Sequence, residues 1–226
     1  ILIEISRRGK KPHEYKNFSM TKTPKEILKN VFGFDSFKIL QGEIIDHAVA
    51  GGDALILMPT GGGKSLCYQV PIAEAAAEHH GRSTSLLLFP TKALAQDQLR
   101  SFGSLGIDHV KPATYDGDTP YEQRTWIRNR CNTILTNPEM IHGSILPNHS
   151  QWARFFRRLQ FVVIDELHVL RGVFGTHVSH ILRRLMRVAR HYGSEPTFCF
   201  TSATIGEPAA LASELCGQPV HHIDDD

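Results

Sequence analysis

The sequence has no long apolar run, no paired-cysteine motif and little net charge. None of its apolar segments approaches the ~20 residues needed to cross a bilayer, and no signal-peptide pattern opens the chain, so no membrane partner is expected. The four cysteines are widely spaced without a C-x-x-C pair, which argues against structural zinc and disulfides and for a reducing, intracellular environment. Because the net charge is only +2, any nucleic-acid partner would have to be recognised by local patches.

The length and composition fit one large α/β domain. The 226 residues are 41% hydrophobic and 21% charged, ordinary values for a globular protein with a sizeable core. Residues 1–20 hold five Lys or Arg against two Glu and show no clear period. We interpret them as a basic, solvated extension, with a nuclear-targeting or DNA-contacting arm as the alternative. Residues 21–226 are predicted to form the domain.

Short apolar runs alternate with helical patterns through this domain. Strands are predicted at residues 54–58, 85–89, 112–115, 132–135, 161–164 and 197–200. Continuous apolar strands separated by helices indicate an α/β fold with a mainly parallel sheet and helices on both faces. Ligands of such sheets bind at the carboxyl ends of the strands, so the residues that follow each strand are the candidate site.

Two helices have clear sequence signals. The first begins with Thr119, Pro120 and Glu122, which predict a capping box with proline at the first helical position. The second spans residues 176–193 and would end at Gly193. Its predicted apolar face consists of Val178, Ile181, Leu182, Leu185, Val188, Ala189 and Tyr192.

A glycine-rich loop follows the strand predicted at 54–58. It contains Thr60, Gly61, Gly62, Gly63, Lys64 and Ser65. Glycines let successive N–H groups point at one anion, and the following helix adds its partial positive charge. Lys64 would reach the β- and γ-phosphates and the Ser65 hydroxyl would ligate Mg²⁺, so ATP and Mg²⁺ are the expected cofactors. The strict motif has glycine where this chain has Met58, and a glycine turn without a ligand is the alternative.

An acidic pair, Asp165 and Glu166, follows the strand predicted at 161–164. A carboxylate at this position can hold Mg²⁺ opposite the phosphate loop, a role that we assign to Asp165. Glu166 could polarise the water that attacks the terminal phosphate. The alternative is an acidic helix start or a solvated turn.

Two helix starts offer candidate nucleic-acid contacts. Thr91 can cap the helix after the strand at 85–89, and Thr91, the helix N-terminus and Lys92 could hold a phosphate. Thr136 and Glu139 predict a second capping box, and Thr136 with Asn137 could make a second phosphate contact. For both segments a purely structural cap is the alternative.

Short hydroxyl side chains follow the strand predicted at 197–200, namely Thr201, Ser202 and Thr204. Such residues form turns readily. Their proposed role is to sense the state of the Asp165 and Glu166 site and to pass it to bound nucleic acid.

Taken in order, these segments resemble the first motor domain of superfamily 2 helicases. MPTGGGKS is similar to motif I, PTKALAQDQ to motif Ia, TNPE to motif Ib, DELH to motif II and TSAT to motif III. Residues 25–71 resemble RecQ-type DNA helicases, and residues 85–226 resemble DNA-repair helicases of the MrfA/YprA type. The resemblance implies a RecA-like P-loop NTPase domain, ending at the linker to a second RecA-like domain.

The resemblance also assigns roles to individual residues. The segment FGFDSFKILQGEIID is similar to the adenine-binding motif of RecQ-type helicases. On this match Phe34 would stack on the adenine ring, Gln41 would read its edge, and Lys38 stands where the family has arginine. His168 of the DELH segment belongs to the nucleotide site on family grounds.

The implied activity is that of an ATP-dependent DNA helicase, moving 3′ to 5′, in repair or recombination. Its partners would be single-stranded or forked DNA and the second domain, whose arginine finger motif is not found in these residues. Such a protein would be cytoplasmic and nucleoid-associated in a prokaryote or nuclear in a eukaryote. The alternatives are an RNA helicase of the DEAH or DEAD kind and a nucleotide-gated binding module without productive hydrolysis.

Two further features are interpreted as structural. Trp126 and Trp152 are expected in the core or in helix packing rather than as base-stacking platforms. A basic stripe on the 176–193 helix is expected to be a solvated polar face, with a DNA contact as the alternative. The stripe consists of Arg183, Arg184, Arg187 and Arg190.

Overall fold

The computed structural model describes residues 3–6, 23–38, 40–58, 62–202, 211–212, 215 and 222–223, with the backbone alone for 3–6 and 222–223. The strands are β1 Ile3–Ser6, β2 Asp53–Leu57, β3 Thr84–Leu88, β4 Pro112–Thr114, β5 Thr133–Thr136, β6 Leu159–Ile164, β7 Thr197–Ser202 and β8 His222–Ile223. The α-helices are α1 Pro24–Phe32, α2 Gln41–Val49, α3 Lys64–Glu78, α4 Lys92–Leu105, α5 Tyr121–Arg130, α6 Pro138–Met140, α7 Ala153–Phe156 and α8 Gly172–His191. Shorter helical turns are η1 Ile141–Ile145, η2 His149–Trp152 and η3 Leu167–Val169.

All eight strands of the described chain belong to one sheet, in the order β4-β5-β3-β6-β7-β2-β1-β8. The six strands from β4 to β2 pair in parallel, and β1 is antiparallel to both β2 and β8. The six predicted strands are therefore present, and the predicted parallel α/β fold is confirmed. The strand at residues 3–6 corrects the interpretation of that part of 1–20 as a solvated extension, because it pairs with β2.

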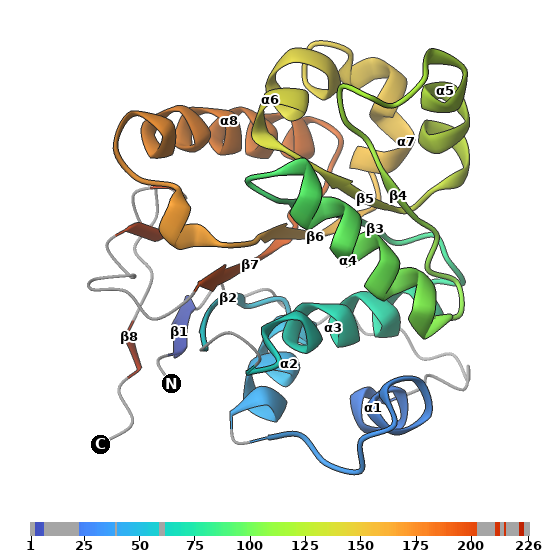
Figure 1. The fold of residues 1–226 in the computed structure, drawn as a ribbon, viewed down its shortest axis with the longest axis vertical. Coiled ribbons are helices and arrows are strands. Elements are labelled where there is room, and N and C mark those ends of the chain that lie inside the picture. Colours follow the sequence, from blue (N-terminus) through green and yellow to red (C-terminus); the bar gives the residue numbers. More distant parts are fainter. Residues whose placement is uncertain are drawn as a thin grey trace.

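Helices cover both faces of the sheet, with α1 to α4 on one face and α5 to α8 on the other (Figure 1). Successive strand residues alternate between two cores, so that Leu55 and Leu57 of β2 pack with α8 whereas Ala54 and Ile56 pack with α1 to α3. This alternation explains why the parallel strands read as continuous apolar runs, since both faces are buried.

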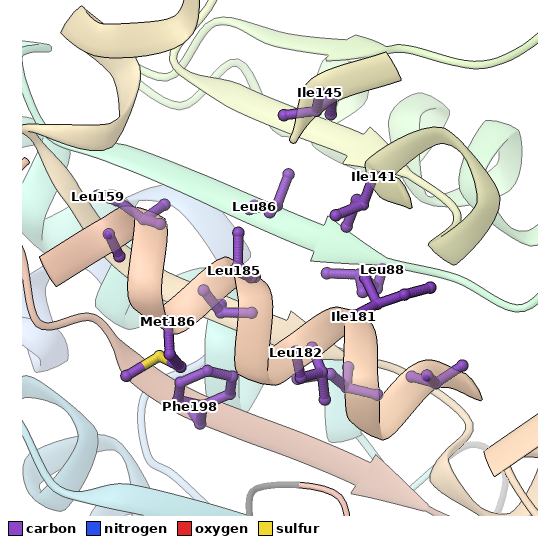
Figure 2. Packing of buried hydrophobic residues seen from close by; sticks show 14 of the residues in the cluster. Leu86, Leu88, Ile141, Ile145, Leu159, Ile181, Leu182, Leu185, Met186 and Phe198 are labelled. Atoms are coloured by element: carbon purple, nitrogen blue, oxygen red, sulfur yellow. The ribbon is translucent and has the colours of Figure 1, made fainter. Parts of the chain in front are cut away.

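The apolar face of α8 anchors one core. Ile181, Leu182, Leu185 and Met186 point toward the sheet and meet side chains such as Leu86 and Phe198 (Figure 2). The predicted face of this helix is confirmed, with Val188 and Tyr192 partly buried at its edge.

The start of α8 lies earlier than predicted, at Gly172 instead of residue 176. Glycine disfavours helices, which explains the missed turn. Gly175 is nevertheless required here, since a Cβ at this position would lie 2.5 Å from the Leu170 carbonyl oxygen. At the other end Tyr192 is the C-cap and Gly193 follows it with φ of 80°, the left-handed conformation expected of a terminating glycine.

The predicted capping box at Thr119 is wrong. Helix α5 begins at Tyr121 with Pro120 as its N-cap and without a side-chain cap hydrogen bond. The Thr119 hydroxyl instead accepts a hydrogen bond from the Asp116 backbone N–H at 2.9 Å, so it closes the preceding turn. A local side-chain bond of this kind competes with capping.

The two tryptophans differ in their exposure to solvent. Trp152 is buried, with 1% of its surface exposed, as expected. Trp126 lies on α5 and is 60% exposed, which corrects its assignment to the core or to helix packing.

No helix among the described residues is long and apolar enough to cross a membrane.

Helix α3 carries a carboxyl group with an unusual titration. Burial, followed by the nearby Glu78 and Asp46 carboxylates, raises the pKa of Glu74 from 4.5 to about 7. The unfolded chain releases this proton at a lower pH than the folded chain does. Stability is therefore lost as the pH rises from 4.5 to about 7, and the loss persists above that range.

The substitution Glu74→Gln should therefore raise the free energy of unfolding above pH 7 by on the order of 1 kcal/mol, since solvent screens part of the full effect. The gain should vanish below the pKa of 4.5 that the free carboxyl has. Urea titrations across this pH range measure it, with the exposed Glu122→Gln as a charge-matched control. A gain that is the same at every pH would contradict the prediction.

Candidate nucleotide site

The order of three neighbouring strands brings the predicted site together. Strands β6, β7 and β2 are adjacent and parallel, so their carboxyl ends meet at one edge of the sheet. Asp165 and Glu166 follow β6, Thr201 and Ser202 end β7, and the glycine loop follows β2. The residues that sequence analysis selected from three distant segments are therefore neighbours in space.

The glycine loop leads directly into α3. Gly63 is the N-cap, with φ of 87°, and Lys64 is the first helical residue. This left-handed conformation favours glycine, and a Cβ on Gly63 would also lie 2.5 Å from the Gln41 amide nitrogen. The free N–H groups of the first helical turn can face an anion at this point. Thr60 and Gly61 lie outside the described residues.

Met58 occupies the position at which the strict motif has glycine. Its side chain is 2% exposed and belongs to the core shared with Ala54 and Ile56. Its backbone N–H donates to the Ser202 carbonyl at 3.3 Å. Met58 thus continues the alternation of β2, and the chain turns into the loop only after it, so a side chain is accommodated there.

Lys64 and Glu166 meet across the site. Lys64 Nζ lies 3.6 Å from Glu166 Oε1, and the two side chains are 11% and 25% exposed. Glu166 has φ of 54°, a left-handed conformation that is uncommon for a residue with a side chain and often marks functional sites. His168 Nδ1 lies 3.1 Å from Glu166 Oε2 but makes no hydrogen bond with it. The Lys64–Glu166 ion pair joins the segment after β2 to the turn after β6.

Asp165 is held by β7. The Thr201 hydroxyl donates a hydrogen bond to Asp165 Oδ1, and both residues are buried. Burial raises the pKa of Asp165, whereas the Thr201 hydrogen bond opposes the shift by favouring the carboxylate. The predicted connection between Thr201 and the acidic pair therefore exists as a direct contact, although its coupling role stays a prediction. Thr204 lies outside the described residues.

Gln41 connects the predicted adenine turn to the glycine loop. Its Oε1 accepts from the Lys38 backbone N–H at 2.9 Å, and its Nε2 donates to the carbonyls of Gly62 and Gly63 at 3.4 and 3.5 Å. The side chain is 4% exposed. Sequence analysis assigned Gln41 to the adenine edge and did not anticipate these loop contacts, for which the sequence holds no signal. Phe34 is 56% exposed, and the Lys38 side chain is also exposed.

The two predicted nucleic-acid segments follow β3 and β5. Thr91 is exposed and caps α4, accepting from the Leu94 backbone N–H at 3.3 Å, as predicted. Lys92 is paired with Asp118, with Nζ and Oδ2 2.7 Å apart, and this contact raises the pKa of Lys92. A phosphate held by Lys92 would have to compete with the Asp118 carboxylate.

The second of these segments differs from its prediction. Asn137, not Thr136, caps α6, and its Oδ1 accepts from the Met140 backbone N–H at 2.9 Å. Thr136 is 1% exposed and its hydroxyl donates to the Tyr115 carbonyl at 2.6 Å. Because Thr136 is the last residue of β5, its side chain is used inside the fold, so it neither caps the helix nor reaches solvent. Asn137 is the half-buried residue left for the predicted contact.

A polar link between α3 and α4 was not foreseen. The Tyr68 hydroxyl donates to Gln98 Oε1 at 3.1 Å, and Gln69 Nε2 lies 3.5 Å from Ser101 Oγ. Tyr68 and Gln69 are both buried on the helix that follows the glycine loop. A polar pair within the apolar segment LCYQVP was the available signal, and its partners on α4 could not be identified from spacing.

A parallel sheet with a glycine loop, a lysine and an acidic pair at the ends of adjacent strands defines a P-loop nucleotide-binding domain of the RecA-like kind. A family model described as DEAD/DEAH box helicase matches residues 38–211. The chain belongs to the DEAD/DEAH box helicase family.

Individual relatives agree with this assignment. The chain is 41% identical over 221 residues to the ATP-dependent helicase YprA of Bacillus subtilis, an alignment that covers 95% of this chain and 29% of YprA. It is 40% identical over 213 residues to the ATP-dependent DNA helicase RecQ of Synechocystis, covering 87% of this chain and 42% of RecQ. The crystal structure of the DUF1998 helicase MrfA bound to DNA and AMPPNP superposes with a TM-score of 0.84 at 39% identity, over 93% of this chain and 30% of MrfA.

These matches confirm the resemblance to superfamily 2 DNA helicases of both the RecQ and the MrfA/YprA types. The YprA alignment covers nearly the whole chain, so the segment with RecQ-like features also resembles YprA. The chain spans less than half the length of each of these relatives.

Replacing Gln41 should weaken the hold on the phosphates as well as on a base. In Gln41→Ala the loop loses its hydrogen bonds to α2, which should lower the affinity for both ATP and inorganic tripolyphosphate by about three- to tenfold. Competition against a fluorescent ATP analogue measures both, with the exposed Gln123→Ala as control. Lost ATP affinity with unchanged tripolyphosphate affinity would mean that Gln41 acts on adenine alone.

Proposed function

We propose that this chain is the ATP-binding motor domain of an ATP-dependent DNA helicase that moves 3′ to 5′ in repair or recombination. The observation that carries the proposal is the approach of Lys64, at the start of α3, to Glu166 at the end of β6. It supports a site in which a cation from the phosphate loop and a carboxylate from the acidic pair face the same reacting phosphate.

The residues of the site fit a nucleoside triphosphate with Mg²⁺. The buried Ser202 Oγ has no hydrogen-bond partner among the described residues, and His168 Nδ1 lies 3.1 Å from Glu166 Oε2 without a hydrogen bond to it, so polar atoms at this edge are available to a ligand. Ser65 and Asp165 are hydroxyl and carboxylate donors of the kind that Mg²⁺ prefers. When bound, the cation would neutralise charge on the phosphate oxygens.

The chain's own groups then have distinct roles. Lys64 would release Glu166 and contact the β- and γ-phosphates, while the first turn of α3 donates backbone N–H groups to them. Glu166 would orient the attacking water and accept its proton. Thr201, bonded to Asp165, would report the state of the site through β7.

Nucleic acid is expected along the other half of the same edge. Thr91 follows β3, which lies beside β6, and Asn137 follows β5, which lies beside β3. The MrfA structure with DNA and AMPPNP supports DNA as the ligand of this chain as well. We place such a protein in the cytoplasm, associated with the nucleoid, in a prokaryote or in the nucleus of a eukaryote.

The 226-residue chain should bind Mg-ATP but hydrolyse it slowly. In related NTPases the arginine finger is worth about 10³–10⁵ in rate, and we expect it from a second RecA-like domain. Against a typical turnover of about 10 s⁻¹, turnover with single-stranded DNA should stay below about 0.01 s⁻¹. Phosphate release measures this. Robust DNA-stimulated turnover by this chain would contradict the prediction.

Substituting Glu166 separates the motor from a nucleotide-gated binding module. In a motor, Glu166→Gln should abolish the residual hydrolysis, because the carboxylate that accepts the proton of the attacking water is lost. The affinity for ATP should stay within about threefold, since the substitution removes a partner that competes with the phosphates for Lys64. The exposed Glu139→Gln serves as control. The binding module would be favoured by two results together. The unsubstituted chain would show no hydrolysis, and Glu166→Gln would leave the nucleotide-dependent affinity for DNA intact or tighter.

An RNA helicase is the second candidate, because its core motifs are shared. Competition between single-stranded DNA and RNA of the same sequence distinguishes the two. The proposal requires DNA to compete at least as well as RNA. A clear preference for RNA, lost in Asn137→Ala, would overturn it in favour of the RNA enzyme.

A further inference from the structure

A basic cavity lies at the opposite edge of the sheet from the nucleotide site. It has a volume of about 180 Å³, and its lining includes Thr84 and Asn132, at or beside the starts of β3 and β5. Six of its lining residues are cationic and none of the lining is Asp or Glu. The cationic residues are Arg82, Lys111, Arg128, Arg130, Arg154 and Arg158.

The loops that carry these cations are tied together. Asn132 Nδ2 donates to the carbonyls of Gly81 and His109 at 3.2 and 2.8 Å, and its Oδ1 accepts from the Lys111 backbone N–H at 2.7 Å. On the next strand the Thr84 backbone N–H donates to the Arg158 carbonyl at 2.9 Å. These bonds fix the backbone that carries Arg82, Lys111 and Arg158 at one edge of the sheet.

Some of these charges have a local structural use. Arg128 and Arg130 lie in the last turn of α5, where cations favour the helix dipole, and Arg154 donates to the Asn129 carbonyl. That account does not extend to Arg82 and Arg158, which come from turns before β3 and β6 and are exposed. Arg82 and Arg158 also line a neighbouring cavity of about 860 Å³ together with Glu78 and Glu195, so carboxylates lie on one side of these two arginines. None of the described residues that line the smaller cavity is a carboxylate, and like charges gathered there repel one another, so the smaller cavity favours an anionic ligand.

An exposed tryptophan lies beside the cavity. Trp126 is 60% exposed and stands one helical turn before Asn129 and Arg130, both of which line the cavity. Residues three and four apart share one face of a helix, so the indole and these two side chains are neighbours. An aromatic platform next to a basic groove is the arrangement that binds single-stranded nucleic acid, where bases stack and phosphates meet cations.

We propose that the strand-start edge is a second single-strand nucleic-acid site, in which Arg82, Arg130 and Arg158 contact phosphates and Trp126 stacks on a base. It lies about 16 Å, the length of the five residues of β3, from the Thr91 edge. The site goes beyond the proposed motor function and does not depend on a bound nucleotide. An acidic polypeptide would satisfy the cations but would leave the exposed indole without a role.

The experiment uses the 226-residue chain without nucleotide and a short oligothymidylate as probe. Binding should quench tryptophan emission through Trp126, since Trp152 is buried. Removing two charges in Arg82→Gln/Arg158→Gln should reduce the slope of log affinity against log salt by about 1.4. The matched pair Arg187→Gln/Arg190→Gln, on the exposed face of α8, should leave both the slope and the quenching unchanged.

Trp126→Ala should lower the affinity about tenfold and Trp126→Phe should restore most of it. Equal slope changes in the two arginine pairs would overturn the proposal, because net charge alone would then explain binding. It is also overturned if polyglutamate binds through Arg82 and Arg158 while oligothymidylate leaves the emission unchanged. Asn137→Ala separates the two edges. If it abolishes binding and the arginine pair has no effect, the further site fails and the motor proposal stands.

Discussion

The position of β7 between β2 and β6 is the constraint on which the nucleotide site depends. Thr201 is opposite Ile56 on one side, and its hydroxyl holds Asp165 on the other. This strand sets the ends of β2 and β6 two inter-strand spacings apart, roughly 10 Å, a separation that the long Lys64 side chain spans to reach Glu166. A threonine with 0% exposure thus aligns two segments that are about a hundred residues apart in the sequence.

Strand β6 then divides the edge into two halves, for which we propose different ligands. On one side lie β7 and β2 with the nucleotide site, and on the other lie β3 and β5 with Thr91 and Asn137. The Asp165 backbone N–H donates to the Leu88 carbonyl of β3, so the acidic turn is fixed to the strand that leads to Thr91. A change at the phosphates could reach bound nucleic acid through this connection or through the Tyr68 and Gln98 contact between α3 and α4.

Strands and site chemistry could be predicted because each rests on residues next to one another in the sequence. Continuous apolar runs located the six parallel strands, and the polar residues after them located Lys64 and Asp165. The predictions that failed concerned residues whose environment depends on contacts with segments distant in the sequence. The Thr136 side chain turned inward to a carbonyl of another segment, and Trp126 lay on a helix whose outward face has no apolar partner. The pairing of residues 3–6 with β2 was hidden by the basic residues that follow them.

The distribution of charge over the surface shows most clearly this limit of prediction from sequence. A net charge of +2 gives no hint of a basic surface, and the six cations of the strand-start cavity come from separate segments between residues 82 and 158. No run of lysine or arginine brings them together. Parallel strands do so, because the turn before each strand returns to the same edge just as the turn after each strand reaches the opposite one. A fold that concentrates ligand-binding groups at its carboxyl edge therefore also concentrates the residues that precede its strands, which before β3, β5 and β6 of this chain include Arg82, Arg130 and Arg158.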